Sequence, residues 1–175
     1  MKSLIVIDML NGFCRRGYPL SVSYSTSMLE KYIAQRIEDT NKKKGHVIFV
    51  CDNHKLGDPE IGSPYPLHCM NGTEEAKIIP PLRKYLKSSK IIFKSTLSIF
   101  YRTELSEVLE QLKSSEIEVT GVFTDICVLF AVYELRIRGF KVFISDKGVL
   151  PLDPAKNLQY LDYFHTRLGA QIELH

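Results

Sequence analysis

Short runs of branched apolar residues alternate along this chain with longer segments in which apolar residues recur at helical spacing. The runs occupy residues 4–7, 46–51, 90–93, 117–122, 140–145 and 171–174, and the helical segments occupy residues 27–43, 103–113, 126–138 and 154–168. Unbroken apolar runs are typical of strands buried on both faces, and strands that alternate with helices form parallel sheets covered on both sides. The pattern predicts an α/β fold with three layers (α/β/α) and a six-stranded, mostly parallel sheet.

The length and composition are ordinary for one globular domain. The chain has 175 residues, 45% hydrophobic and 25% charged, and we expect a single domain over residues 1–175. The net charge of +3 is too small, and the Lys and Arg residues too scattered, to indicate a nucleic-acid partner. No segment approaches the roughly 20 apolar residues of a membrane span, and the first residues lack a signal-peptide pattern. We therefore expect a cytoplasmic protein with no membrane partner and with its four cysteines reduced.

Three chemically distinct residues stand where predicted strands end. Asp8 follows the first strand, Lys94 follows the third, and Cys127 lies in the first turn of the helix after the fourth. Because the carboxyl ends of parallel strands share one edge of the sheet, an acid, a cation and a thiol can meet there. Each also has an ordinary structural interpretation: Asp8 as a turn residue, Lys94 as a surface cation, and Cys127 as a small buried apolar residue.

Together the three residues suit nucleophilic catalysis. A helix N-terminus favours negative charge by ~0.3–1 kcal/mol, which draws a thiol toward the thiolate, the form that attacks. Asp8 can take the proton of Cys127, and Lys94 can stabilise both negative groups. Backbone amides in the strand-to-helix turn can hold the negative oxygen that forms when a carbonyl is attacked. We therefore predict that Cys127 is a nucleophile.

A long irregular segment, residues 53–81, follows the second predicted strand. A loop of this length inside a compact domain is usually functional. Asp52, His54, Glu60 and His68 offer two imidazoles and two carboxylates, a set that suits a borderline divalent ion such as zinc, iron or manganese. The alternative interpretation is a polar, solvated loop.

Three stretches carry a resemblance to a known family. They are Val-Ile-Asp-Met-Leu-Asn-Gly-Phe at residues 6–13, Lys-Ser-Thr-Leu-Ser-Ile-Phe at residues 94–100, and Gly-Val-Phe-Thr-Asp-Ile-Cys-Val at residues 121–128. In this order they resemble the isochorismatase-like cysteine hydrolases, and among them the nicotinamidases. The resemblance implies a catalytic triad of Asp8, Lys94 and Cys127. It also implies a cis peptide bond between Val122 and Phe123, and an oxyanion hole formed by the amides of Phe123 and Cys127.

The resemblance to the nicotinamidases extends to the presumed metal loop. Those enzymes have an Asp-x-His pair, matched by Asp52 and His54, and a later His that precedes a Gly-Thr pair, as His68 does. Their third ligand is His or Glu, which Glu60 fits better than Asp58. The resemblance implies one divalent metal ion, with zinc as the first expectation and iron or manganese as the others. The ion would bind the pyridine nitrogen and so position the substrate ring.

The activity implied by the resemblance is hydrolysis of a small amide, nicotinamide, to nicotinate and ammonia in NAD salvage, through a thioester on Cys127. Phe13, Leu97 and Phe100 match positions that form the substrate pocket. Leu97 and Ile99 depart from the aromatic and small residues common in the family. These departures leave the exact amide open.

Other functions remain compatible with the sequence. One is a hydrolase of the same family that acts on a different amide or on a carbamoyl group. Another is a non-catalytic binding module that kept the fold. Hydrolysis of isochorismate is disfavoured, because that reaction cleaves a vinyl ether and does not need the cysteine. A homo-oligomer is compatible with the sequence, and Cys51 and Cys69 are interpreted as structural.

Overall fold

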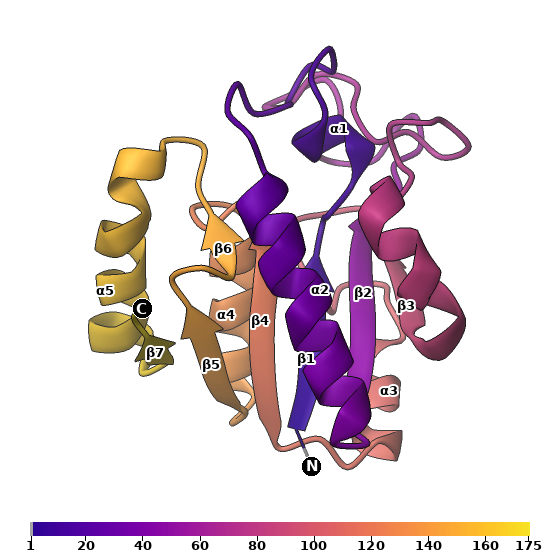
Figure 1. The fold of residues 1–175 in the computed structure, drawn as a ribbon. Helices are drawn as coiled ribbons and strands as arrows, with labels where there is room; N and C mark the ends of the chain where they lie inside the picture. Colours follow the sequence, from indigo (N-terminus) through magenta and orange to yellow (C-terminus); the bar gives the residue numbers. More distant parts are fainter. Residues whose placement is uncertain (1) are drawn as a thin grey trace.

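A parallel sheet runs through the middle of the molecule. The computed structural model describes residues 2–175 and orders the strands β3-β2-β1-β4-β5-β7, with β6 beside β4 (Figure 1). The strands are β1 (Lys2–Ile7), β2 (His46–Asp52), β3 (Lys90–Lys94), β4 (Glu116–Val122), β5 (Lys141–Ser145), β6 (Val149–Leu150) and β7 (Gln171–Glu173). All the pairings between these strands are parallel. This confirms the predicted α/β architecture, and adds the two-residue strand β6, which is too short to leave a pattern in the sequence.

The register of the central strands brings their carboxyl ends level. β1 lies between β2 and β4, so that Ile7 is opposite Val50 on one side and Gly121 on the other. Across the next pairing, Asp52 at the end of β2 is opposite Lys94 at the end of β3. Residues that follow these strands therefore share one edge of the sheet.

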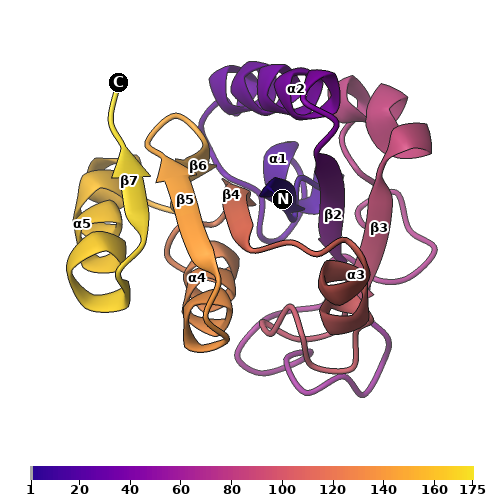
Figure 2. The same cartoon turned by 90° about the horizontal axis from the view of Figure 1, so that it is seen from below.

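Helices cover both faces of the sheet (Figure 2). The helix α2 (Ser27–Lys42) and the 3-10 helix η1 (Pro80–Ser88) lie on one face, and α3 (Leu105–Gln111), α4 (Cys127–Ile137) and α5 (Asn157–Leu168) lie on the other. Two shorter pieces, α1 (Asn11–Cys14) and the 3-10 turn η2 (Pro154–Lys156), precede α2 and α5 in the chain. The predicted helices therefore exist; the start of α2 and the end of α5 coincide with the predicted residues, and the other ends are displaced by one to three residues.

The core consists of two apolar clusters, one on each face of the sheet. Successive side chains of a strand point to opposite faces, and β1 supplies both clusters. Ile5 and Ile7 pack with the residues of α3, α4 and α5. Leu4 and Val6 pack with those of α2 and η1. All four are almost fully buried, which fixes β1 as the rigid centre on which Asp8 is placed.

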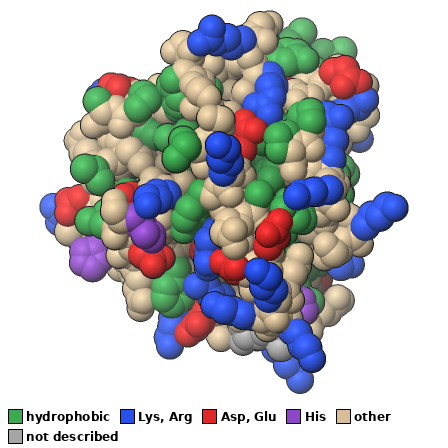
Figure 3. All heavy atoms as spheres, viewed as in Figure 1, with side chains coloured by type: hydrophobic (Ala, Val, Ile, Leu, Met, Phe, Trp, Pro, Cys, Tyr) green, Lys and Arg blue, Asp and Glu red, His purple; other side chains and the backbone are tan. Residues whose placement is uncertain are grey.

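The irregular segments gather beyond the carboxyl ends of the strands. The arrowheads of the central strands point toward α1 and the long segment between β2 and η1, at the top of Figure 1. This is the end at which parallel α/β sheets bind their ligands. On the face covered by α2, acidic and basic side chains are interspersed with hydrophobic ones (Figure 3). Within residues 2–175, no helix has the length and apolar character needed to cross a membrane.

Candidate active site

A buried lysine stands between two buried carboxylates at the ends of β1, β2 and β3. The exposed fractions of Asp8, Asp52 and Lys94 are 0%, 3% and 2%. The Nζ of Lys94 lies 2.9 Å from Oδ2 of Asp8 and forms a second ion pair with Oδ1 of Asp52. A buried charge is tolerated only when it is paired. The two carboxylates therefore explain how a lysine can lie in the interior.

The backbone fixes the position of Asp8. Its amide donates to the carbonyl of Val50 at 2.9 Å, and its Oδ1 accepts from the amide of Asp52 at 2.8 Å. Its φ of +50° lies in the left-handed region, where Asp is tolerated better than most residues. The chain thus turns at the end of β1 and directs the carboxylate toward the end of β2.

Cys127 approaches this group from the other side. It is the first residue of α4, it is 4% exposed, and its Sγ lies 3.8 Å from Nζ of Lys94. One carboxylate oxygen of Asp8, one of Asp52 and the Sγ of Cys127 all lie within 4.8 Å of one another. The structure therefore brings together the acid, the cation and the thiol singled out in the sequence.

The turn between β4 and α4 leaves two amides available. The peptide bond between Val122 and Phe123 is cis, as the resemblance implied. The amides of Ile126 and Val128 both donate to the carbonyl of Phe123, at 3.0 and 3.1 Å. Within residues 2–175, the amides of Phe123 and Cys127 donate no hydrogen bond to another backbone group. These are the two donors expected to form an oxyanion hole.

Burial dominates the protonation of the site. Burial, together with the charge of Asp52, raises the pKa of Asp8 to about 6 against the opposing effect of Lys94. Burial also raises the pKa of Cys127 well above the usual thiol value; Lys94 opposes this shift, and Asp8 and Asp52 add to it. Burial therefore opposes the thiolate that the helix N-terminus was expected to favour. The thiol rests protonated beside a carboxylate.

The charges of Asp52 and Lys94 reinforce each other. Burial alone would raise the pKa of Asp52, but Lys94, His54 and His68 outweigh it and hold that pKa well below the usual range. Burial alone would lower the pKa of Lys94, but Asp52 and Asp8 raise it well above its usual value. Asp52 is thus ionised, and Lys94 is charged.

Asp52 also belongs to a cluster of potential metal ligands. One ligand atom from each of Asp52, His54 and His68 lies within 4.8 Å of the others, and all three side chains are buried. His54 is 0% exposed, yet neither of its ring nitrogens has a hydrogen-bond partner among the described residues. Two imidazoles, one with both nitrogens unsatisfied, and an ionised carboxylate fit a borderline divalent ion.

The two further candidate ligands lie outside this cluster. The Oε1 of Glu60 accepts a hydrogen bond from the amide of Leu97, on the wall of the cavity described next. Oδ2 of Asp58 lies 3.5 Å from Nδ1 of His54 and accepts from the amide of Lys55 at 2.8 Å. One oxygen of Glu60 is thus engaged by Leu97, whereas Asp58 contacts Nδ1 of the candidate ligand His54.

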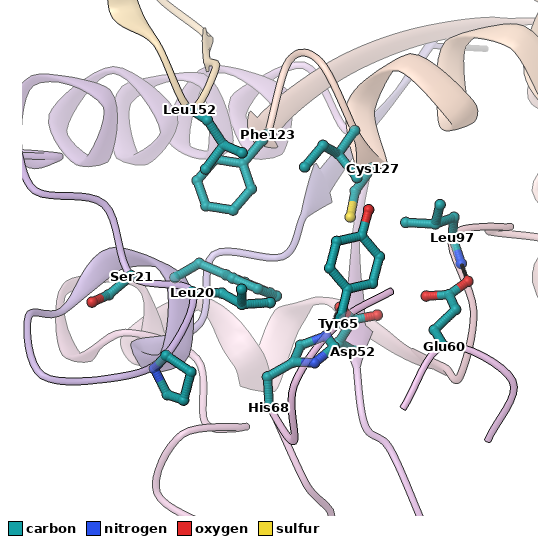
Figure 4. A pocket seen from close by; sticks show the side chains of 13 residues that line it. Leu20, Ser21, Asp52, Glu60, Tyr65, His68, Leu97, Phe123, Cys127 and Leu152 are labelled. Carbon is teal, nitrogen blue, oxygen red and sulfur yellow. Dashed lines mark hydrogen bonds and ion pairs between the residues drawn. The ribbon is translucent and has the colours of Figure 1, made fainter. Parts of the chain in front are cut away.

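A cavity of about 210 Å³ opens onto both Cys127 and the metal cluster. Figure 4 shows Cys127 and Leu97 on one side, His68 on another, and Phe123 beneath Leu152. The other lining residues are Phe13, Pro19, Leu20, Ser21, Asp52, Glu60, Tyr65 and Ile126. Most of the wall is apolar, and its polar side chains are those of Ser21, Asp52, Glu60, Tyr65, His68 and Cys127. The cavity therefore suits a small, largely apolar molecule with few polar groups.

Of the three residues expected in the substrate pocket, two line the cavity and one does not. Phe13 and Leu97 line the cavity, and the ring of Phe13 packs edge-on against that of Phe123, with centroids 5.4 Å apart. Phe100 does not line it; its ring lies in the core beneath Arg138, whose guanidinium carbon is 4.0 Å from the ring centroid. The side chain of Phe100 points away because the segment after Leu97 turns toward α4.

Sequence reasoning missed Tyr65, which lines the cavity and packs against His68 with ring centroids 5.8 Å apart. It also missed Ile126 and Leu152, which have no signal apart from their position near strand ends. A signal for Tyr65 existed, since it is the one Phe, Tyr or Trp residue within the irregular segment 53–81. Cys51 and Cys69 are buried and lie outside the cavity lining, in keeping with a structural role.

Comparison with known proteins gives consistent matches along the chain. A family model described as the isochorismatase domain matches residues 2–173. Nicotinamidase 1 of Arabidopsis thaliana is 30% identical over 185 residues, covering 89% of this chain and 73% of that protein.

Solved structures match equally far. The nicotinamidase PncA of Bacillus subtilis superposes with a TM-score of 0.89 at 28% identity, covering 98% of each chain. The N-carbamoylsarcosine amidase of Thermoplasma acidophilum superposes with a TM-score of 0.85 at 25% identity, covering 99% of this chain and 95% of that one.

Proposed function

This chain belongs to the isochorismatase family and is a hydrolase of amide carbon–nitrogen bonds, and within that activity we propose that its substrate is nicotinamide. The observation that carries the proposal is the shared cavity, which has Cys127 on one wall and His68 with Asp52 on another. Nicotinamide is a flat ring with a carboxamide at one position and a nitrogen at another. Such a molecule can present its carbonyl to the thiol while its ring nitrogen faces the metal cluster.

In the proposed reaction, Asp8 takes the proton of Cys127 as the sulfur attacks the carboxamide carbon. The negative oxygen that forms is held by the amides of Phe123 and Cys127. Asp8 returns the proton to the nitrogen, ammonia leaves, and a thioester remains on Cys127. Asp8 then takes a proton from water, which attacks the thioester, and the thiol regains a proton as nicotinate leaves. Lys94 stabilises the charges of Asp8 and the sulfur throughout.

The metal proposal concerns the other wall. Asp52, His54 and His68 would hold one divalent ion, with zinc as the first candidate and Glu60 as a further ligand. When bound, the ion supplies an acceptor for the ring nitrogen. The protein's own groups do the remaining positioning: Phe13, Phe123 and Tyr65 flank the cavity with rings, and the buried wall limits access of water.

Ammonia release from a panel of amides tests the proposal. The panel contains nicotinamide, an aliphatic amide and an N-carbamoyl amino acid, each with and without a chelator. We expect nicotinamide to be hydrolysed, the chelator to suppress turnover, and added zinc, iron or manganese to restore it. Cys127→Ala should abolish turnover and retain ring binding, whereas Cys14→Ala, which changes a buried cysteine outside the cavity lining, should retain both. Substantial ammonia release by Cys127→Ala would sink the assignment.

A second candidate is hydrolysis of a carbamoyl group, which the likeness to the N-carbamoylsarcosine amidase of Thermoplasma acidophilum favours. It prevails if nicotinamide is inert, the carbamoyl compound is turned over, and activity survives removal of metal. A binding module without activity prevails if the whole panel is inert and a thiol reagent does not label Cys127 in preference to the other three cysteines.

A further inference from the structure

The wall of the cavity opposite Phe123 comes from the segment between β3 and α3. This segment follows Lys94 and carries Leu97 into the lining. It contains no helix or strand, so its shape depends on the side chains that hold its backbone. Two carboxylates from distant parts of the chain do so.

The first carboxylate is Glu134, on the helix that begins with Cys127. Seven residues separate the two, about two helical turns, so both lie on the same side of α4. The Oε1 of Glu134 accepts from the hydroxyl of Ser98 at 2.7 Å, and its Oε2 accepts from the amide of Ile99 at 2.9 Å. Its side chain is only 16% exposed. Both oxygens of a largely buried carboxylate are thus used on the two residues that follow Leu97.

The second carboxylate is Glu60, which accepts from the amide of Leu97 itself. Figure 4 shows this contact at the edge of the cavity. Ser98 extends the arrangement, because its Oγ accepts from the amide of Tyr101 at 2.8 Å. Residues 97–99 are therefore held from the side of the metal loop by Glu60 and from the side of the nucleophile helix by Glu134.

We propose that Glu134 is a positioning residue that sets the distance between the Leu97 wall and Cys127. Its two hydrogen bonds join Ser98 and Ile99 to the same helix that carries the nucleophile, so the position of Leu97 relative to Cys127 is set through α4. The role for catalysis rests on the proposed function, since it assumes that the substrate lies against Leu97 when its carbonyl meets Cys127. Glu134 touches neither the cavity nor the reacting atoms and acts through Leu97.

Glu134→Gln tests this role, because glutamine keeps the size of the side chain but offers one acceptor oxygen instead of two. We expect KM for nicotinamide to rise about tenfold while kcat stays within about threefold, since the wall moves and the triad does not. Carbamidomethylation of the Cys127 thiol by iodoacetamide, with loss of iodide, should be faster, because a displaced wall exposes the thiol. Ser98→Ala removes the hydrogen bond to Oε1 of Glu134 together with the acceptor for the amides of Phe100 and Tyr101, and should change both quantities in the same directions. Glu110→Gln, an exposed glutamate on α3, is the matched control and should change neither quantity.

A second background separates positioning from general stability. In Leu97→Ala protein, Glu134→Gln should no longer raise KM, because the side chain through which it acts is gone. An equal rise in both backgrounds, or a loss of active protein with unchanged KM and alkylation rate, would overturn the proposal. If the wild-type protein does not hydrolyse nicotinamide, the proposed function fails. The alkylation rates, which need no turnover, then still decide the role of Glu134.

Discussion

The carboxylate of Asp8 accepts a hydrogen bond from the backbone amide of Asp52 at 2.8 Å. Its other oxygen is engaged by Lys94 at 2.9 Å. Asp52 also contributes to the group of potential metal ligands with His54 and His68. Asp8, the proposed proton acceptor, is thus joined to Asp52, a proposed metal ligand, by a hydrogen bond from the main chain of Asp52. We therefore expect a substitution at either residue to disturb the position of the other.

Removal of Lys94 should destabilise the fold as well as abolish activity. Lys94→Met leaves the carboxylates of Asp8 and Asp52 buried together without their cation, and removing one partner of a buried ion pair costs about 3–5 kcal/mol. We expect urea denaturation of chelator-treated protein to show a loss of that size. The double variant Asp8→Asn/Lys94→Met should recover part of it, because one uncompensated charge is gone. A single variant as stable as the wild type would contradict the buried pairing.

The candidate ligands should differ in their effect on metal binding. His54→Ala and His68→Ala are expected to weaken zinc binding at least about 100-fold, because each removes a buried ligand. Glu60→Gln should weaken zinc binding less than about tenfold, since one oxygen of its carboxylate is engaged by the amide of Leu97. Equilibrium dialysis followed by elemental analysis measures this without turnover. The Glu110→Gln protein serves as the unaffected reference, and equal losses for His54→Ala and Glu60→Gln would make Glu60 a full ligand.

A partly buried ion pair far from the cavity predicts how stability changes with pH. Arg36 donates to both oxygens of Glu118, at 2.6 Å each. Burial alone would raise the pKa of Glu118, but Arg36 and Lys2 outweigh it and lower that pKa below its usual value. The pair therefore stabilises the fold fully above the unfolded pKa of about 4.3, and this contribution is lost as the pH falls through the lower, folded value.

We accordingly expect Glu118→Gln to lower the free energy of unfolding at pH 7 by about 1.5–3 kcal/mol. The difference from the wild type should shrink as the pH is lowered from about 5 toward 3. Chemical denaturation at a series of pH values measures both. The Glu110→Gln variant should follow the wild-type curve, and a difference that grows toward acid would refute the assignment.

Gly121 should tolerate no side chain. Its φ is +120°, and a Cβ there would lie 2.0 Å from the carbonyl oxygen of Ile7, the residue before Asp8. At Gly139, φ is +86° and a Cβ would meet nothing within 4 Å. Gly139→Ala should cost about 1–2 kcal/mol from backbone conformation alone. Gly121→Ala should cost more than about 4 kcal/mol, because β1 or β4 must also move. Thermal denaturation compares the two, and similar losses would show that the contact with Ile7 is unimportant.

The sequence predicted the location of those site residues that stand at the ends of strands, because the ends of parallel strands share one edge of the sheet. Asp8 and Lys94 stand at the ends of buried strands and Cys127 begins a helix, so the parallel arrangement allows them to meet, and the family resemblance implies that they form a triad. The short strand β6 was missed because two residues carry no periodicity. The ion pair of Lys94 with Asp52 was missed for a different reason: it depends on the register between β2 and β3, which no local pattern encodes.

The remaining errors concern loops and burial depth. Phe100 was expected in the pocket, but the direction of its side chain is set by contacts with α4, which follows it in the chain by more than twenty residues. Tyr65 and Glu60 lie in an irregular segment, and its path is set by contacts with the other segments at the carboxyl ends of the strands. The burial that raises the pKa of the Cys127 thiol could not be predicted, because a helix terminus is visible in the sequence whereas complete burial of a side chain is not.

The central position of β1 affects the order in which this protein can become active during folding. β1 pairs with β4, joining residues 2–7 to residues 116–121, and closing so long a stretch of chain is slow compared with forming local helices. Asp8 and Cys127 lie just beyond the two ends of that pairing. The rate at which turnover recovers after dilution from denaturant would thus report when β1 pairs with β4, the pairing with the longest separation in sequence. The circular dichroism of the helices would report only local structure.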